Sequence, residues 1–150
     1  MLVNELMSKN VVTIESTNTV LEACRRYHRH KIGCLVVMRF GMMVGIITER
    51  DIITRVIIPL RDPFKTKVEE IMSTNIKTIH PSEDVKLAAE IMGKYKIKKL
   101  PVVSDKKELV GIITITDIAN TMPNFLKSLA EGHDAELNRE DENKVPEATV

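Results

Sequence analysis

The sequence has few of the residues on which several protein classes depend. Its only aromatic residues are two tyrosines and three phenylalanines, which are scattered and form no interleaved platform for stacking nucleic-acid bases. There are two cysteines, Cys24 and Cys34, and both lie within apolar stretches. Free thiols in such settings are usually small buried hydrophobes, so we expect no disulfide.

The sequence contains no long hydrophobic run, and its first residues do not predict a secretory signal. No apolar run approaches the ~18–20 residues needed to span a bilayer, and residues 1–10 show no basic segment followed by a long apolar stretch. We therefore expect no membrane insertion and a cytoplasmic location. With 43% hydrophobic and 29% charged residues, the chain has the composition of one compact soluble domain.

The net charge of +1 conceals an uneven distribution. Residues 131–150 hold seven acidic and two basic residues, a net charge of −5, so residues 1–130 carry +6. A mildly basic body suits an anionic small molecule, although a similar excess is common on solvated surfaces.

The sequence repeats itself after 65 residues. With this offset Val3–Ser8 aligns with Val68–Ser73, and after a one-residue slip Val44–Thr48 is identical to Val110–Thr114. In total, 20 positions between residues 3 and 52 are identical in the two copies. Shorter repeats usually build open stacks of three or more units. Two longer copies instead predict a closed pair, in which each copy buries its apolar face against the other around a pseudo-twofold axis.

Each copy is predicted to be a β-α-β-β-α unit, which makes the fold class α/β. A short strand precedes a helix with apolar residues at helical spacing, then two aliphatic strands form a hairpin, and a second helix ends near a proline. We expect Thr17 and Ser82 to cap the first helices. The predicted strands are 11–14, 35–38 and 44–47 in the first copy and 76–79, 100–103 and 110–113 in the second, and the second helices run from 49 toward 57 and from 115 toward 121. The domain units are then 1–62, 63–125, and a C-terminal helix with a polar acidic tail at 126–150.

A Gly-x-x-Thr-x-x-Asp pattern stands where the last strand of each copy meets its helix, from Gly45 to Asp51 and from Gly111 to Asp117. A helix start offers backbone N–H groups that favour a phosphate. A carboxylate at this place can accept hydrogen bonds from both hydroxyls of a ribose, with the threonine hydroxyl near the sugar or phosphate. The alternative is a capping box, in which the threonine caps the helix and the aspartate binds back. The pattern alone favours neither.

With these features the sequence resembles the paired cystathionine β-synthase (CBS) domain family, also called the Bateman module. The resemblance covers about residues 1–125 and rests on the Val-x-Glu-Leu/Ile-Met-Ser openings, on Ile97–Val103, and on both Gly-Ile-Ile-Thr-x-x-Asp endings. It implies two interlocked α/β units whose clefts bind adenosine derivatives such as AMP, ADP, ATP or S-adenosylmethionine, with AMP the leading candidate. It also implies a homodimer that signals to an unidentified effector protein, and no catalytic cofactor.

The resemblance further implies a role for each matching position. Asp51 and Asp117 would hold ribose hydroxyls, with Thr48 and Thr114 beside the sugar and phosphate. The adenine would be bordered, partly through backbone groups, by Thr13, Ile14, Thr78, Ile79, Ile46 and Ile112. The opposite strand edge would consist of Gly33, Cys34, Leu35, Lys98, Lys99, Leu100 and Pro101, with the lysines toward phosphate.

The copies differ in charge at this expected site. Lys98–Lys99 stand where the first copy has Gly33–Cys34, whereas Arg50 stands where the second copy has Thr116. Consecutive residues entering a strand point to opposite sides, so the two lysines are able to serve different clefts. We therefore expect two clefts of unequal charge and affinity. Ordinary surface charge at a strand edge is the alternative for the lysine pair.

Other functions have less support. Cys24 and His28 have the i, i+4 spacing of metal ligands, with His30 nearby, but no cysteine or carboxylate cluster completes a site, and we expect no metal. The second copy does not echo this pair as a nucleophile and base, and we expect no enzyme. A dimerising scaffold with vestigial clefts and a nucleic-acid binder that uses the basic body are the alternatives. The apolar hairpin tip at 40–43 is either a dimer contact or folded back on the core.

Overall fold

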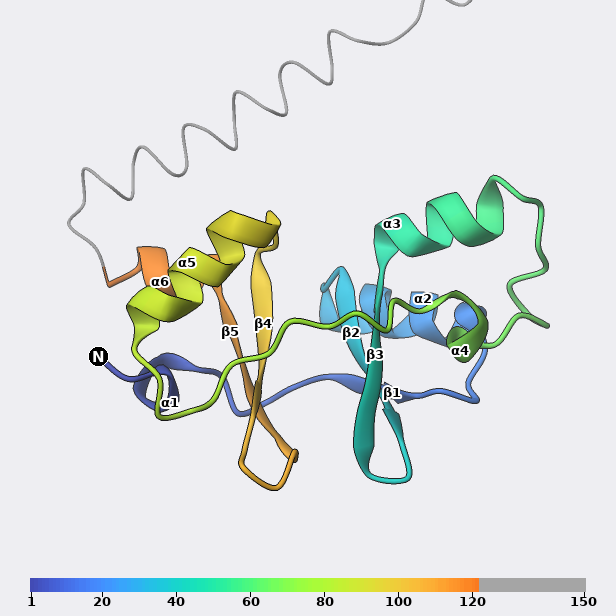
Figure 1. The fold of residues 1–150 in the computed structure, drawn as a ribbon. Helices are drawn as coiled ribbons and strands as arrows, with labels where there is room; N and C mark the ends of the chain where they lie inside the picture. The colour runs from blue at the N-terminus through green and yellow to red at the C-terminus, as the bar shows by residue number, and fades with distance from the viewer. Residues whose placement is uncertain (122–150) are drawn as a thin grey trace, which may run out of the picture.

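The computed structural model describes residues 1–121, and they form a mixed α/β fold. Both copies have the order helix, helix, hairpin, helix, and the first copy has in addition a strand at Thr13–Glu15 and a π-helix at Ile53–Ile57. In Figure 1 the hairpins of the two copies lie side by side with their tips pointing the same way. The predicted C-terminal helix and the acidic tail lie outside the described residues, and so does Pro123, the proline expected to end the second copy's last helix. The elements are α1 (Val3–Leu6), β1 (Thr13–Glu15), α2 (Val20–His30), β2 (Cys34–Arg39), β3 (Met42–Thr48), α3 (Glu49–Ile52), the π-helix η1 (Ile53–Ile57), α4 (Val68–Ile71), α5 (Val85–Tyr95), β4 (Lys99–Val103), β5 (Leu109–Thr114) and α6 (Ile115–Ala119).

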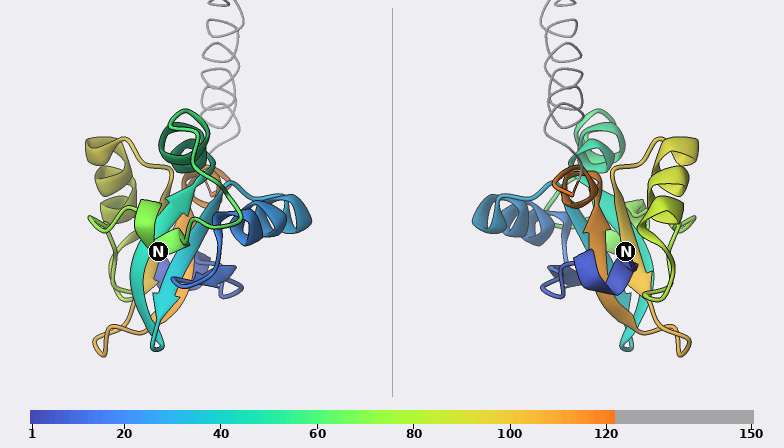
Figure 2. Two further views of the ribbon diagram at one scale, coloured as in Figure 1. Left: turned by 90° about the vertical axis from the view of Figure 1, so that its right-hand side faces the viewer. Right: turned by 90° about the vertical axis from the view of Figure 1, so that its left-hand side faces the viewer.

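The described strands form a three-stranded sheet, β1-β2-β3, and a two-stranded sheet, β4-β5. β1 runs parallel to β2, and each hairpin is antiparallel. The prediction of a strand at 76–79 was wrong, because this segment makes only one parallel bridge, between Ile79 and Val102. The reason is Pro101, whose carbonyl accepts from Ile79 N at 3.1 Å but which has no N–H to continue the ladder. Figure 2 shows α2 and α5 on opposite sides of the strands.

The two long helices, α2 and α5, begin later than predicted. Their N-caps are Thr19, which accepts from Glu22 N, and Asp84, which accepts from Lys86 N. Thr17 and Ser82 were therefore the wrong caps. Backbone from the other copy's opening segment fixes the starts, because Val20 N donates to Thr66 O and Val85 N donates to Met1 O, both at 2.9 Å.

The two copies exchange their opening helices. Val3 of α1 is fully buried in the core of the second copy, among residues that include Leu100 and Ile113. Val68 and Ile71 of α4 are buried in the core of the first copy, among residues that include Leu35 and Ile47. In Figure 1 the chain crosses between the two halves after α1 and again after α4. Neither copy therefore has a complete core without the other.

The segment after each exchanged helix pairs with the edge of the other copy's hairpin. Ser73 and Ile46 exchange two backbone hydrogen bonds of 2.8 and 2.9 Å, and Ser8 and Ile112 exchange two of 2.9 Å. This close approach requires the glycine of each repeated pattern. A Cβ on Gly111 would lie 2.9 Å from Ser8 O, and one on Gly45 would lie 3.1 Å from Ser73 O. The glycines thus serve the contact between copies.

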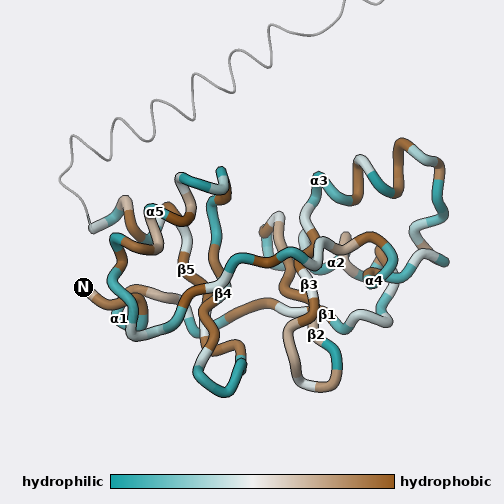
Figure 3. Tube along the Cα trace, viewed as in Figure 1, coloured by the Kyte–Doolittle hydropathy of each residue, from teal (hydrophilic) through white to brown (hydrophobic). Residues whose placement is uncertain are grey.

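The second helix of the first copy carries an exposed apolar surface. The predicted helix from 49 toward 57 is present, with α3 continuing as the π-helix η1. Figure 3 shows hydrophobic segments along the turns that follow α3. Large apolar side chains at least half exposed there are Ile53, Ile57, Ile58, Leu60 and Phe64. Within residues 1–121 no helix is both long and apolar enough to cross a bilayer.

Candidate functional site

A cavity of about 570 Å³ lies between the two copies at the end of β3. Residues from both copies form its walls, because the exchange of α4 brings the connection after this helix against the first copy's hairpin. From the first copy the lining residues are Gly33, Cys34, Ile46, Thr48 and Asp51, and from the second they are Ser73, Asn75, Ile76, Lys77, Ile97, Lys98, Lys99, Pro101 and Ile112.

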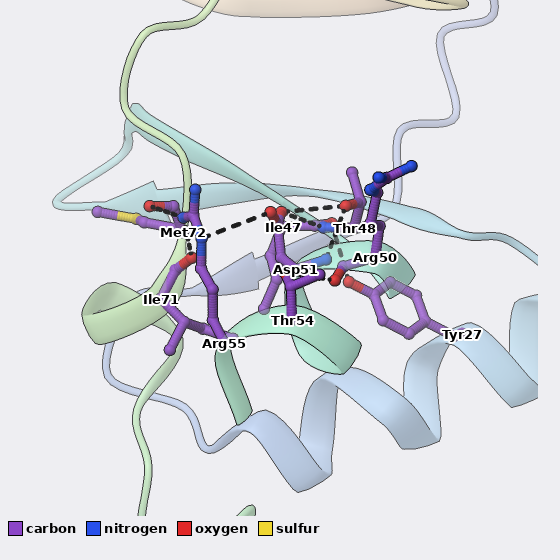
Figure 4. A network of polar contacts seen from close by, with 9 residues as sticks. All are labelled: Tyr27, Ile47, Thr48, Arg50, Asp51, Thr54, Arg55, Ile71 and Met72. Atoms are coloured by element: carbon purple, nitrogen blue, oxygen red, sulfur yellow. Dashed lines mark hydrogen bonds and ion pairs between the residues drawn. The ribbon is translucent and has the colours of Figure 1, made fainter. Parts of the chain in front are cut away.

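Asp51 closes the start of α3 with one of its two carboxylate oxygens. Oδ2 accepts from Thr48 N at 2.9 Å and from Thr48 Oγ1 at 3.0 Å, while Asp51 N donates to Thr48 Oγ1 at 3.2 Å. These contacts are drawn in Figure 4. Oδ1 has a different neighbour, Arg55 Nε at 3.9 Å, which is beyond hydrogen-bonding distance. The capping box is therefore present and uses only Oδ2, while Oδ1 makes a long ion pair with Arg55.

Asp117 makes the same capping box in the second copy. Its Oδ2 accepts from Thr114 N at 2.8 Å, and its own N–H donates to Thr114 Oγ1 at 3.2 Å. Neither residue lines the 570 Å³ cavity. The two copies therefore share the local motif but differ in the space beside it.

The cavity contains nine of the residues that the sequence nominated. They are Gly33, Cys34, Ile46, Thr48, Asp51, Lys98, Lys99, Pro101 and Ile112. The remaining ten lie elsewhere. Ile14, Leu35, Ile79 and Leu100 are buried in the two cores, Arg50 and Thr116 are exposed, and Thr78, Thr114 and Asp117 line neither this cavity nor the next. Thr13 lines a second cavity of about 580 Å³, with Lys9, Glu15 and Glu108 among its other residues.

Sequence reasoning missed the cavity residues that follow α4. Ser73, Asn75, Ile76 and Lys77 line the cavity although they are far along the chain from Asp51, and Ile97 lines it as well. One signal was available, because Ser73 and Asn75 are identical to Ser8 and Asn10 in the repeat. Their use in the site depends on the exchange of α4, which the repeat alone does not specify.

The cavity is lined by several basic residues and contains a thiol of low reactivity. Three of its residues are the lysines Lys77, Lys98 and Lys99. The Lys77 ammonium lies 4.3 Å from the centroid of the Tyr95 ring, in a cation–π contact. Burial raises the pKa of the Cys34 thiol, and the nearby Lys99 only partly opposes this shift. Cys34 therefore stays protonated at neutral pH and is a poor nucleophile.

A Ser-His-Asp arrangement occurs away from the cavity. His80 Nδ1 lies 2.6 Å from Ser82 Oγ and accepts from Ser82 N at 3.2 Å, while His80 Nε2 lies 3.0 Å from Asp105 Oδ1. Asp105 is 94% exposed, and none of the three residues lines either cavity. The arrangement ties the turn before α5 to the β4–β5 turn. Within the described residues, no three His, Cys, Asp or Glu side chains are grouped as a metal site.

The sequence model of the CBS domain matches residues 3–58 and 68–124, so the chain belongs to the CBS domain family and carries two of its motifs. It is 34% identical over 123 residues to the CBS domain-containing protein YhcV of Bacillus subtilis, covering 81% of this chain and 86% of YhcV. It is 40% identical to the L-aspartate semialdehyde sulfurtransferase of Methanocaldococcus jannaschii, but spans only 22% of that longer protein.

Solved structures agree with this membership. The CBS domain pair of protein MJ0100, in complex with 5′-methylthioadenosine and S-adenosyl-L-methionine, superimposes with a TM-score of 0.71 at 36% identity, covering 80% of this chain and 94% of that one. The CBS domain protein TA0289 of Thermoplasma acidophilum gives a TM-score of 0.76 at 27% identity, covering 89% and 76%. The tandem α/β fold is thus that of a CBS domain pair.

Proposed function

We propose that this chain is a non-catalytic regulatory module that binds an adenine nucleotide, AMP first among them, in the cavity at Asp51. One observation carries the proposal. Asp51 lines a cavity between the copies, and its helix cap uses only Oδ2, so Oδ1 is available to the hydroxyls of a ribose. The same cavity holds three lysines, which suit a phosphate.

The lining residues suggest an orientation for the nucleotide. Ile46, Ile76 and Ile112 supply apolar surface for an adenine ring, and Asp51 would accept from the ribose hydroxyls. The phosphate would then extend toward Lys77, Lys98 and Lys99. The CBS pair of MJ0100 supports an adenosine derivative as the ligand class. Because the lysines attract anions and repel a sulfonium, we place AMP ahead of S-adenosylmethionine.

Calorimetry on Asp51→Asn tests the site. Asparagine keeps an oxygen for the cap, but its amide nitrogen cannot accept from the ribose, and a hydrogen bond to a charged group is worth about 1.5–3 kcal/mol. The affinity for AMP should therefore fall about 10- to 100-fold. Asp117→Asn is the matched control, since Asp117 forms the same capping box outside this cavity.

The titrations should use AMP, ADP, ATP, S-adenosylmethionine and 5′-methylthioadenosine. Binding that is equally strong in wild type and Asp51→Asn would disprove the site. If no compound binds and the protein is still a stable dimer, it would act instead as the dimerising scaffold.

We also propose that the module is a homodimer joined through the exposed apolar surface after α3. Ile57, Ile58 and Leu60 are 55%, 68% and 90% exposed, and clusters of this kind commonly mark protein contacts. The hairpin tip is the competing surface, because Phe40 is 87% exposed and is not folded back on the core. Ile57→Glu should give a monomer in analytical ultracentrifugation, whereas Phe40→Glu should not. An effector protein would read the ligand state of this dimer.

A further inference from the structure

Arg55 joins the proposed ribose carboxylate to the exchanged helix. Its Nη1 donates to Ile71 O at 2.6 Å and to Met72 O at 3.4 Å, and its Nε lies 3.9 Å from Asp51 Oδ1. Figure 4 shows the guanidinium between Asp51 and the end of α4. The last carbonyls of a helix have no partner within the helix, so an arginine is well suited to bind them. The Arg55 side chain thus contacts both Asp51, which lines the cavity, and the end of the exchanged helix α4.

The carbonyls held by Arg55 lead directly into the cavity wall. Ser73, the next residue after Met72, exchanges two hydrogen bonds with Ile46, and both residues line the cavity. Asn75, Ile76 and Lys77 follow and line it as well. A displacement of the end of α4 would therefore move the wall opposite Asp51.

Within residues 1–121 the second copy has no counterpart of this connection. The residue four positions after Asp117 is Thr121, which follows α6 and whose hydroxyl donates to Ile118 O of that helix at 2.7 Å. The two copies also differ in the space beside the aspartate, because Asp51 lines the 570 Å³ cavity and Asp117 does not. In the part of the chain that the structure describes, an arginine in this position therefore accompanies Asp51 and not Asp117.

We propose that Arg55 is a positioning residue that orients the Asp51 carboxylate and passes the occupancy of the cavity to the exchanged helix α4. The inference rests on the proposed function. Ribose hydroxyls on Asp51 would fix the carboxylate, and a movement of about 1 Å would bring Nε to hydrogen-bonding distance of Oδ1. The occupied state then has one contact more than the empty state, which is what a ligand-dependent shift of α4 requires.

Arg55→Met tests the inference, with Arg61→Met as the matched control. Arg61 also contacts the exchanged helix, through Glu70 Oε1 at 2.7 Å, but it has no contact with Asp51 within the described residues. Circular dichroism would first confirm that both variants are folded. Calorimetry would then use AMP and the uncharged 5′-methylthioadenosine, since loss of an arginine near a phosphate weakens AMP binding by charge alone.

We expect Arg55→Met to weaken both compounds by a similar factor of about five to 20, and Arg61→Met to change neither by more than twofold. Hydrogen exchange should show AMP protecting residues 71–77 in wild type and in Arg61→Met. At equal occupancy this protection should be lost in Arg55→Met.

Three results would overturn the role of Arg55: a loss of AMP affinity alone, an equal loss in Arg61→Met, or retained protection of residues 71–77 in Arg55→Met. If Asp51→Asn lowers AMP affinity while Arg55→Met does not, the inference fails and the proposed function stands. If Asp51→Asn binds AMP as wild type does, or nothing binds, both fail together.

Discussion

Gly45→Ala is expected to loosen the exchange between the two copies. The new methyl group would lie 2.9 Å from Met72 Cγ and 3.1 Å from Ser73 O. The methionine side chain is able to move away, but Ser73 O is held by its 2.9 Å hydrogen bond from Ile46 N. The backbone of the exchanged segment must therefore shift outward, and overpacking of this kind costs about 1–3 kcal/mol.

The expected change in unfolding follows from that cost. For a chain of this size each kcal/mol corresponds to about 2–4 °C, so the Tm of Gly45→Ala should fall by about 2–12 °C. Gly93→Ala is the matched control. Gly93 lies within α5, and a Cβ there would meet no atom within 4 Å. Alanine should stabilise the helix at this position by about 0.4–1 kcal/mol.

The same substitution should also affect binding, because Ser73 lines the cavity. We expect Gly45→Ala to lower AMP affinity severalfold and Gly93→Ala to leave it unchanged. Thermal and urea unfolding followed by circular dichroism, together with calorimetry, would measure both effects. Unfolding of Gly45→Ala within about 0.5 kcal/mol of wild type would refute the steric argument, since surface substitutions produce changes of that size. Equal shifts in the two alanine variants would refute it as well.

Three further predictions concern the core, the thiols and pH. Ile71→Ala should lower the free energy of unfolding by about 2–5 kcal/mol, because Ile71 of the exchanged α4 is 1% exposed in the first core. Ile115→Ala is the control and should change the free energy of unfolding far less, because the Ile115 side chain is 38% exposed. Equal effects of the two substitutions in urea unfolding would argue against the exchange. Saturating AMP should slow the reaction of Cys34 with N-ethylmaleimide, since Cys34 lines the cavity, and leave Cys24 unaffected; mass spectrometry showing equal labelling of Cys34 with and without AMP would contradict the placement. Burial raises the pKa of Cys24 and of Cys34 in the folded state. The stability that the two thiols contribute is therefore complete below the ordinary thiol pKa of about 8.5 and is lost as pH rises through the raised values, so the free energy of unfolding should fall above about pH 8.5. If the free energy of unfolding of a double Cys24→Ala, Cys34→Ala variant declines as steeply, the thiols are not the cause.

The site was predictable to the extent that it is local. Thr48 and Asp51 stand three residues apart at a helix start, and that spacing alone places their polar groups together. The same reasoning gave Thr114 and Asp117, which have the same geometry without the same cavity. It also gave Thr17 and Ser82 as caps, which failed because backbone from another part of the chain fixes the helix starts.

By itself, the sequence determined that the chain has two similar α/β units, each with an aspartate in the first turn of its last helix. The duplication is visible when the two halves are compared, and the apolar alternation and the capping depend only on neighbours along the chain. Only the tertiary structure decided which core each opening helix enters. The openings at 3–8 and 68–73 share four of six residues and the same apolar positions, so apolar pattern alone does not distinguish the two cores. That choice places Ser73 and Lys77 in the same cavity as Asp51, and it therefore decides where the cavity lies and which charged residues line it.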